Sequence, residues 1–237
     1  ILMGLLHGYR GEARIFGRPP GAQGRKFYER IGVSFELPTL YLRLTALENL
    51  KLFAALYSGR TRDPMETLAL VGLEDDANKR VEAFSKGMKM RLNLCRALLH
   101  DPELLFLDEP TTGQDPARAR LTRQLLLDLK KQGKTIFLTT HNMAEADEIC
   151  DRVGFLAHGR ADVIGQPQAL KEQYGKRVLE VTTTENGARK RYEFPMDGLG
   201  ANAEFLALLK ADQIATMHTL EATLDDVFIR ATQAGRS

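Results

Sequence analysis

A run of apolar residues that ends in two carboxylates is the strongest feature of the hydrophobic pattern. Residues 104–107 are all apolar, and Asp108, Glu109 and Pro110 follow them directly. A short, continuous apolar run predicts a strand that is buried on both faces, as in a parallel sheet. Ligands of open α/β sheets bind beside the carboxyl ends of the strands. The two acids are therefore candidates for holding Mg²⁺ and acting on water; the alternative is a core strand followed by a solvated acidic turn.

Strands and helices alternate along much of the chain, which predicts an α/β fold. Residues 30–36, with alternating apolar side chains, are expected to form one strand, and residues 135–140 a second buried strand. A capping box at Thr45 and a proline at position 64 each predict the start of a helix. The other expected elements are the end of a buried helix (residues 1–6), a short strand (11–16), a helix (143–150) and a hairpin (153–156 and 161–164).

Residues 86–99 predict an amphipathic helix that begins directly after Ser85. Serine is a favoured N-cap, and the free N–H groups of a first helical turn can also bind an anion. The expected buried face holds Met88, Leu92, Cys95 and Leu99, and the expected exposed face holds Lys86, Lys89, Asn93 and Arg96.

Composition narrows the class of protein. The 237 residues are enough for one large α/β domain, alone or with an appendage. The net charge is +2 without a block of like charge, so no nucleic-acid partner is predicted. Cys95 and Cys150 fall in helical patterns, which favours a reducing compartment over a disulfide framework. No apolar run approaches the ~20 residues that span a bilayer, so a membrane role would depend on a partner.

A domain boundary is expected near Gly165 and Pro167, which gives domains over residues 1–165 and 166–237. The second domain is expected to be a small α+β region without a catalytic constellation, suited to packing or dimerisation. Its expected strands are residues 178–184 and 189–194, around a turn at Asn186-Gly187, and residues 214–218; its expected helices are residues 202–209 and 223–232.

The order and spacing of these motifs resembles the ATP-binding subunit of an ABC transporter, over nearly the whole chain. Residues 84–88 resemble the family's signature motif, residues 113–115 its D-loop, and residues 139–141 its switch region. The resemblance implies a P-loop NTPase-like, mostly parallel sheet with a helical subdomain over about residues 37–100 and a small C-terminal α+β unit. Residues 220–228 resemble the end of drug, polysaccharide and lipid exporter ATPases.

The resemblance also implies a role for each motif in binding or hydrolysing ATP. Asp108 would be the Mg²⁺ ligand, Glu109 the general base for the attacking water, and His141 the contact to the γ-phosphate. Glu36 stands in the Q-loop, where it would sense Mg²⁺ and the nucleotide. The nucleotide of a second subunit would be contacted by Ser85, Lys86, Gly87, Met88 and Asp115.

Several positions depart from the family pattern. Glu36 replaces a glutamine, Lys86 a glycine, Met88 a glutamine and Gln114 an apolar residue. Lys86 would either crowd the nucleotide or attract its phosphates. The phosphate-binding GxxxxGK[ST] loop is absent from the sequence, and residues 24–26 are expected to be a surface loop. We expect the phosphate loop to lie upstream of residue 1.

The implied function is the ATP-binding and ATP-hydrolysing subunit of an ABC exporter. Its partners would be a transmembrane subunit, contacted near residues 36–45, and a second ATP-binding subunit, at the cytoplasmic face of the membrane. An alternative is a non-catalytic subunit that completes a partner's ATP site. The missing phosphate loop, Lys86 and Gln114 favour this alternative, and Glu109 and His141 oppose it. A DNA-repair or translation ATPase is a third, but the chain has no room for the coiled coil or second domain of those proteins.

Overall fold

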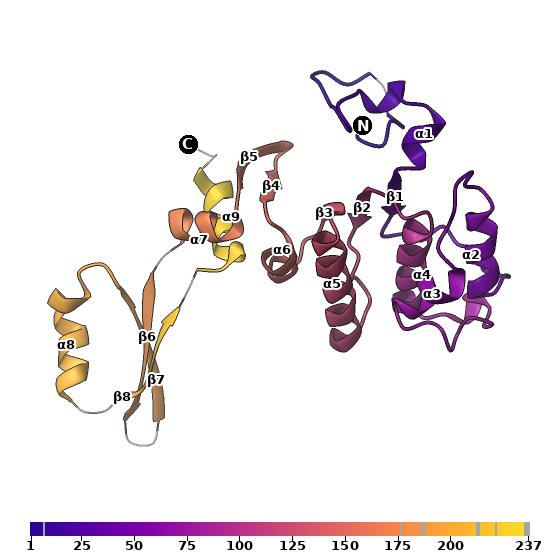
Figure 1. Ribbon diagram of the computed structural model, residues 1–237. Helices are drawn as coiled ribbons and strands as arrows, with labels where there is room; N and C mark the ends of the chain where they lie inside the picture. The colour runs from indigo at the N-terminus through magenta and orange to yellow at the C-terminus, as the bar shows by residue number, and fades with distance from the viewer. Residues whose placement is uncertain (7, 176, 186–187, 212–213, 221, 235–237) are drawn as a thin grey trace. The chain divides into compact units, whose positions relative to one another are not determined.

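The computed structural model describes all residues except 7, 176, 186–187, 212–213, 221 and 235–237 (Figure 1). The chain divides into two compact units, Ile1–His141 and Asn142–Ser237. The two units differ in contacts between residues and do not test the domain boundary predicted at residue 165, which stays a prediction. None of the described helices is long and apolar enough to cross a membrane.

A parallel three-stranded sheet lies at the centre of the first unit. Its strands are β1 (Ile31–Ser34), β2 (Leu104–Asp108) and β3 (Thr135–Thr139), in the order β1-β2-β3. Residues 104–107 are buried, as their continuous apolar sequence predicts, and Leu104 and Phe106 pack in a core cluster with Phe27 and Ile31. The predicted α/β fold is confirmed.

Strand β3 is less buried than its sequence predicts. The expectation of a second buried strand is wrong, since burial alternates along β3 and Phe137 is 49% exposed. The physical reason is its position: β3 is an outer strand of the described sheet, so local apolar sequence alone does not bury both of its faces.

Helices cover the sheet and form the predicted insertion. Helix α4 (Lys86–Leu98) packs on β1, and α5 (Pro116–Lys131) on β3. Helices α2 (Ala46–Ala54) and α3 (Pro64–Ala69) pack on each other and on α4 (Figure 1). Thr45 forms the predicted capping box with Glu48, and a short 3-10 turn (Val81–Ala83) precedes Ser85.

Two polar side chains of α4 hold the segment that follows β1. Asn93 was expected on the exposed face of the helix, but it is 0% exposed. Its Nδ2 donates to Ser34 Oγ and to the Phe35 carbonyl, both at 3.0 Å. Arg96 Nη1 donates to the Thr39 carbonyl at 2.8 Å. The helix and the segment 34–39 are therefore fastened together at two points.

The N-terminal segment departs from its predictions. A helix over residues 1–6 and a strand over 11–16 are both wrong, because turns and one isolated bridge, Ile15 to Arg18, occupy this segment. Glycines at positions 4, 8, 11 and 17 all have positive φ, which breaks regular structure. A 3-10 turn (Pro20–Ala22) and a short helix, α1 (Arg25–Tyr28), follow; the latter replaces the surface loop expected after Gly24.

The second unit has two separate apolar cores. One joins α6 (Met143–Ile149), the hairpin β4 (Val153–Ala157) and β5 (Arg160–Gly165), α7 (Pro167–Tyr174) and α9 (Leu224–Ala234). The other lies between an antiparallel sheet and a helix. It is formed by β6 (Val178–Glu185), β7 (Ala188–Pro195), β8 (Ile214–Leu220), a 3-10 turn (Leu199–Ala201) and α8 (Ala203–Lys210).

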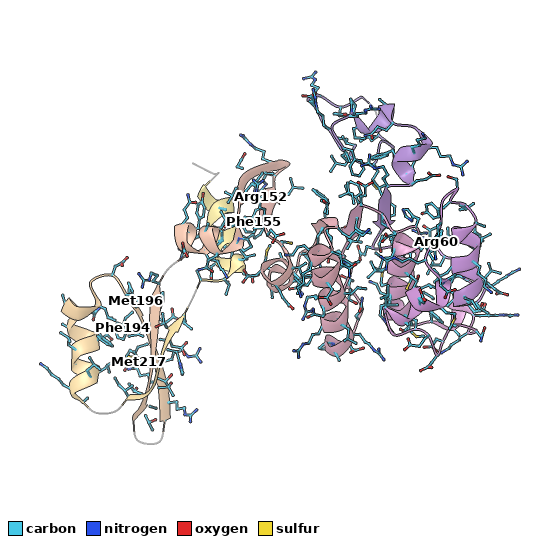
Figure 2. The ribbon with its side chains drawn as sticks, in the orientation of Figure 1. Arg60, Arg152, Phe155, Phe194, Met196 and Met217 are labelled. Atoms are coloured by element: carbon cyan, nitrogen blue, oxygen red, sulfur yellow. The ribbon has the colours of Figure 1, made fainter. Side chains whose placement is uncertain are left out.

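The predicted strands and helices of the C-terminal region are thus present. The sheet order is β7-β6-β8, with both pairings antiparallel. Figure 2 labels Phe155 in the first core and Phe194 in the second. The turn predicted at residues 186–187 lies outside the described residues.

Candidate functional site

Asp108 ends strand β2 and is held by a hydroxyl from the neighbouring strand. The register pairs Asp108 with Thr139, the last residue of β3. Thr139 Oγ1 donates to Asp108 Oδ1 at 2.5 Å. The sheet register therefore fixes one oxygen of the first acid.

Glu109 leaves the strand through an unusual backbone conformation. Its φ is 49°, in the left-handed region, which costs a non-glycine residue about 1–3 kcal/mol and persists only where the surrounding structure holds it. Its N–H donates to the Thr139 carbonyl at 2.9 Å, so the backbone turns while still attached to β3. This turn directs the carboxylate toward the residues that follow β3.

Four donors meet the Glu109 carboxylate. Oε1 accepts from the His141 backbone N–H at 2.8 Å and lies 2.7 Å from His141 Nδ1. Oε2 accepts from Thr112 Oγ1 at 3.2 Å and from Thr140 Oγ1 at 3.3 Å. Because a carboxylate can only accept, the hydrogen of this pair lies on Nδ1 of the ring.

Electrostatics keep the Glu109 carboxylate ionised. Burial acts to raise its pKa, but the hydrogen bonds from the His141 ring and backbone N–H, with the His141 charge, bring the pKa below its usual value. The Glu109 side chain is 17% exposed and that of His141 is 83% exposed. The acid is thus sheltered, and the imidazole lies at the surface where a ligand could reach it.

Residues 85–88 form the start of α4, as predicted. Ser85 is its N-cap, and its Oγ accepts from the Met88 N–H at 3.2 Å. A side chain at Gly87 would place its Cβ 2.7 Å from the Gly113 carbonyl oxygen. Only glycine therefore allows the start of α4 to approach the segment 113–115 this closely.

Lys86 lies across the same contact. A Cβ built on Gly113 would be 3.0 Å from Cγ and Cδ of Lys86, so the lysine stem covers the glycine. The Lys86 ammonium is 3.9 Å from Glu36 Oε1, with both side chains about half exposed. Two of the departures from the family pattern, Glu36 and Lys86, are therefore paired with each other within the chain.

Gln114 and Asp115 both stabilise their own segment. Gln114 Nε2 donates to the Pro110 carbonyl, and its Oε1 accepts from the buried hydroxyl of Thr122, each at 2.9 Å. Asp115 caps α5, because its Oδ1 accepts from the Arg118 N–H at 3.0 Å. The glutamine thus braces the loop between β2 and α5 from inside, which gives this departure a structural role.

The structure groups the predicted site residues into two sets. Asp108, Glu109 and His141 meet at the carboxyl ends of β2 and β3, and Glu36 joins residues 85–88 and 113–115 through Lys86. None of the described contacts joins residues 85–88 to Asp108 or Glu109. Sequence reasoning missed the hydroxyls that hold the acids: Thr112, Thr139 and Thr140. Two threonine pairs were their signal in the sequence. Residues 111–112 come shortly after the two acids, and residues 139–140 directly precede His141.

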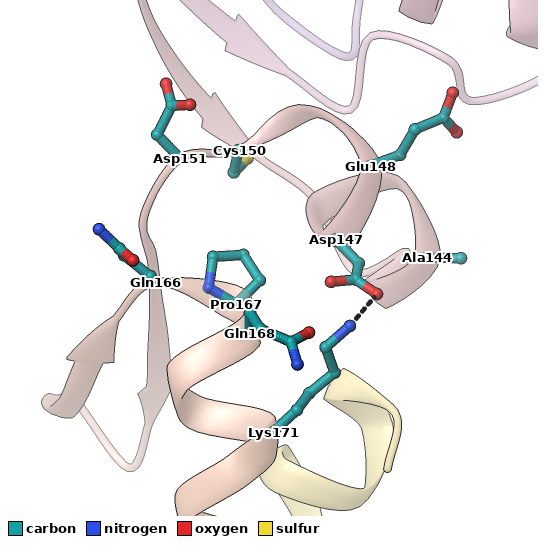
Figure 3. Close-up of a pocket in the computed structure, with 9 residues that line it drawn as sticks. All are labelled: Ala144, Asp147, Glu148, Cys150, Asp151, Gln166, Pro167, Gln168 and Lys171. Carbon is teal, nitrogen blue, oxygen red and sulfur yellow. Dashed lines mark hydrogen bonds and ion pairs between the residues drawn. The ribbon is translucent and has the colours of Figure 1, made fainter. Parts of the chain in front are cut away.

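A hollow in the second unit does not extend this chemistry. Its volume is about 690 Å³ beside α6 and the start of α7, and its lining includes the acidic residues Asp147, Glu148 and Asp151 (Figure 3). Lys171 already pairs with Asp147 there at 2.9 Å. Within the described parts of the chain, no group of three or more His, Cys, Asp or Glu residues is arranged for a metal ion.

The fold and the site together define an ATP-binding cassette. The profile of the ABC transporter family matches residues 1–112, and that of the fluoroquinolone efflux ABC transporter C-terminal domain matches residues 177–221. A fluoroquinolones export ATP-binding protein of Mycobacterium tuberculosis is 49% identical over 233 residues, which are 98% of this chain and 77% of that protein. The chain belongs to the ABC transporter family of ATP-binding proteins.

Other relatives agree with this membership. A Nod factor export ATP-binding protein I from Rhizobium is 41% identical over 76% of this chain, which spans 61% of that protein. The solved structure of an ATP-binding subunit of an ABC transporter superposes with a TM-score of 0.65 at 29% identity, over 73% of this chain and 74% of that one. A dimeric ATP-binding cassette bound to ADP and Pi has a TM-score of 0.56 at 26% identity, over 64% and 71% of the two chains. The prediction of an ABC-type ATPase subunit of the export class is confirmed.

Proposed function

We propose that this chain drives the export of fluoroquinolone-like compounds by hydrolysing ATP at Glu109 and His141. The observation that carries the hydrolytic role is the His141–Glu109 pair at 2.7 Å, next to Asp108 at the end of the central strand. The substrate class is supported by the 49% identity to a fluoroquinolones export protein and by the C-terminal match. The transported compound itself would contact the membrane subunit.

In this proposal Glu109 orients the attacking water by accepting its hydrogen bond. The water oxygen bonds to the γ-phosphorus, the bond from that phosphorus to the bridging oxygen breaks, and ADP leaves. The water proton passes to Glu109, whose lowered pKa keeps the carboxylate ionised and ready to accept it. In its imidazolium form His141 donates from both nitrogens, so it can bind Glu109 and a γ-phosphate oxygen together.

Asp108 would hold Mg²⁺, which would neutralise phosphate charge. The residues present fit this ion, because Mg²⁺ sites usually use one or two carboxylates with waters and phosphate oxygens. Thr139 fixes one Asp108 oxygen and so sets the direction in which the carboxylate faces the ion. Glu36 is proposed as the second acidic contact, with its charge partly offset by Lys86.

Two copies would enclose each nucleotide, with residues 85–88 and Asp115 of one facing the hydrolytic set of the other. The first-turn N–H groups of α4 suit a phosphate anion. This arrangement would lie on the cytoplasmic face of the membrane, and the segment 34–45 would transmit closure to the transmembrane subunit. Gln114 no longer supports the non-catalytic alternative, because its hydrogen bonds to Pro110 and Thr122 give it a structural role within its own chain.

The test is drug accumulation in cells that express the full-length protein with its membrane subunit. We expect lower accumulation of a fluoroquinolone with the parent and normal accumulation with a Glu109→Gln variant. If the purified complex hydrolyses ATP but never lowers accumulation, the substrate assignment is wrong. If it lowers accumulation without hydrolysing ATP, the catalytic role is wrong.

Replacing Thr139 should weaken Mg²⁺ binding. Without its hydroxyl, Asp108 loses a charge-assisted hydrogen bond, so Thr139→Val is expected to raise the Mg²⁺ concentration for half-maximal ATPase activity about tenfold. Thr139→Ser keeps the hydroxyl and should restore the parent value. The same Mg²⁺ dependence in the valine variant and in the parent would show that Asp108 needs no such support.

Lys86→Gly is expected to weaken ATP-driven dimerisation rather than strengthen it. The ammonium is drawn toward Glu36, so its loss leaves an uncompensated carboxylate near the proposed nucleotide. Exposed pairs contribute little, so the expected change is at most about fivefold, and it should shrink at high salt. A Lys86→Met variant keeps an apolar side chain over Gly113 but removes the ammonium. Comparing it with Lys86→Gly separates the effect of the charge from the effect of the side-chain contact. Tighter dimers in the glycine variant would favour crowding of the nucleotide instead.

A further inference from the structure

Strand β8 is an outer strand of its sheet, and its pairing with β6 shifts register between Thr182 and Thr183. It pairs with β6 from Ile214 to Leu220, and no other described strand pairs with it. The strand contains no proline and no Lys, Arg, Asp or Glu, its one ionisable side chain is His218, and residues 215–220 are all exposed. An exposed edge without these residues is a template for pairing with another strand.

The opposite edge of the same sheet is protected. Strand β7 carries Arg189, Lys190, Arg191 and Glu193, and it ends at Pro195. Charged side chains and proline are the usual means by which sheet edges avoid pairing. Because both edges belong to one small sheet, their difference indicates that β8, and not β7, is the edge that meets a partner.

The side chains of β8 agree with this assignment. Met217 pairs with Val181, which is fully buried, so both lie on the face covered by α8. Met217 is nevertheless 40% exposed, as is Leu220 at the end of the strand. Figure 2 labels Met217 on this sheet. A strand added beside β8 would cover the flank of Met217 that its own unit leaves open.

We propose that β8 pairs in an antiparallel manner with β8 of a second copy of this chain, about a two-fold axis at Met217. This register places Met217 opposite Met217 of the partner subunit and residues 216 and 218 opposite each other, within the part of β8 that pairs with β6 without a register shift. No cross-strand pair joins two ionisable side chains, because His218 lies opposite Thr216, so no like charges oppose each other. The strand is thus its own complement, which a two-fold interface requires.

A second copy is favoured over an unrelated partner for two reasons. The strand has no Lys, Arg, Asp or Glu side chain that could form an ion pair with a charged strand of another protein. A structural relative of the ATP-binding unit is dimeric, and two copies held at one transporter would meet at a raised effective concentration. The pairing does not rest on ATP hydrolysis, so it should persist without nucleotide and in the Glu109→Gln variant.

Cross-linking tests the register. Opposed residues of antiparallel strands have Cα atoms about 4.5–5.5 Å apart, within the range of a disulfide. In the full-length protein without nucleotide, Met217→Cys should form an intermolecular disulfide under mild oxidation. Ala188→Cys, on the protected edge, is the matched control and should not cross-link. Equal cross-linking of the two variants, or none in the Met217→Cys variant, would overturn the proposal.

Sedimentation of the nucleotide-free protein tests the surface separately. Thr216→Lys adds an edge charge and should weaken the dimer at least tenfold, whereas Ala188→Lys on β7 should leave it unchanged; circular dichroism checks that both variants fold. A parent that stays monomeric, or a lysine variant that dimerises as the parent does, contradicts the pairing. Hydrogen-exchange protection of residues 214–220 that requires the membrane subunit would assign the edge to that subunit and overturn the second-copy proposal.

Discussion

Glu109→Gln is expected to lower ATP turnover by about 10²–10⁴-fold, the usual contribution of a general base, while ATP-driven dimerisation remains. The amide oxygen can still accept from the His141 N–H, so the loop keeps its shape, but the amide cannot take the proton of the attacking water. Phosphate release, measured beside sedimentation with ATP in a Thr216→Lys background that removes the nucleotide-free pairing, separates the two effects.

Glu103→Gln is the matched control for this prediction. Glu103 is an exposed carboxylate that pairs with Arg30 at 2.6 Å, and it immediately precedes β2. The control should hydrolyse ATP as the parent does. Near-parent hydrolysis by the Glu109 variant would remove that residue from the catalytic role.

Gly32→Ala should destabilise the first unit by about 3 kcal/mol, at the upper end of the usual cost of overpacking. An added Cβ would lie 2.2 Å from the Ala97 carbonyl oxygen and 2.7 Å from Leu105 Cδ2. Since the nearest atom belongs to the backbone of α4, the helix itself would have to move away from β1. Urea unfolding followed by circular dichroism measures the loss.

Gly59→Ala provides the comparison for Gly32. A Cβ at Gly59 meets no atom within 4 Å, and its φ is not positive. This variant should unfold within about 0.5 kcal/mol of the parent, as surface substitutions usually do. Equal stability of the two alanine variants would mean that α4 and β1 separate more easily than their contact indicates.

The sequence predicted the elements whose signals are local. The apolar run before Asp108 identified β2, and Ser85 and Thr45 identified the starts of two helices. These succeeded because a continuous apolar run or a capping side chain acts through its nearest neighbours. Glu109 and His141 were predicted from family resemblance to work together, and their direct contact follows from the adjacency of β2 and β3.

The failures concern properties that depend on distant neighbours. The exposure of β3 depends on which elements cover an outer strand, and its own sequence does not contain this information. Asn93 was expected at the surface because of its place in the helical pattern, but two acceptors after β1 hold it in the core. Thr139 was missed as a partner of Asp108, because only the register of the two strands brings them together.

If residues 85–88 and Glu36 bind nucleotide as proposed, the attachments of α4 to the segment 34–39 would link the two nucleotide sites through one helix. Its first turn would contact the ATP of the opposite copy, while Glu36, in the attached segment, would contact the ATP of its own. A rod of about 20 Å carries a tilt at one end to the other with little bending. The segment 34–45 would therefore take up its closed-state position only when both nucleotide sites hold ATP. Binding at a single site would not be enough to move it.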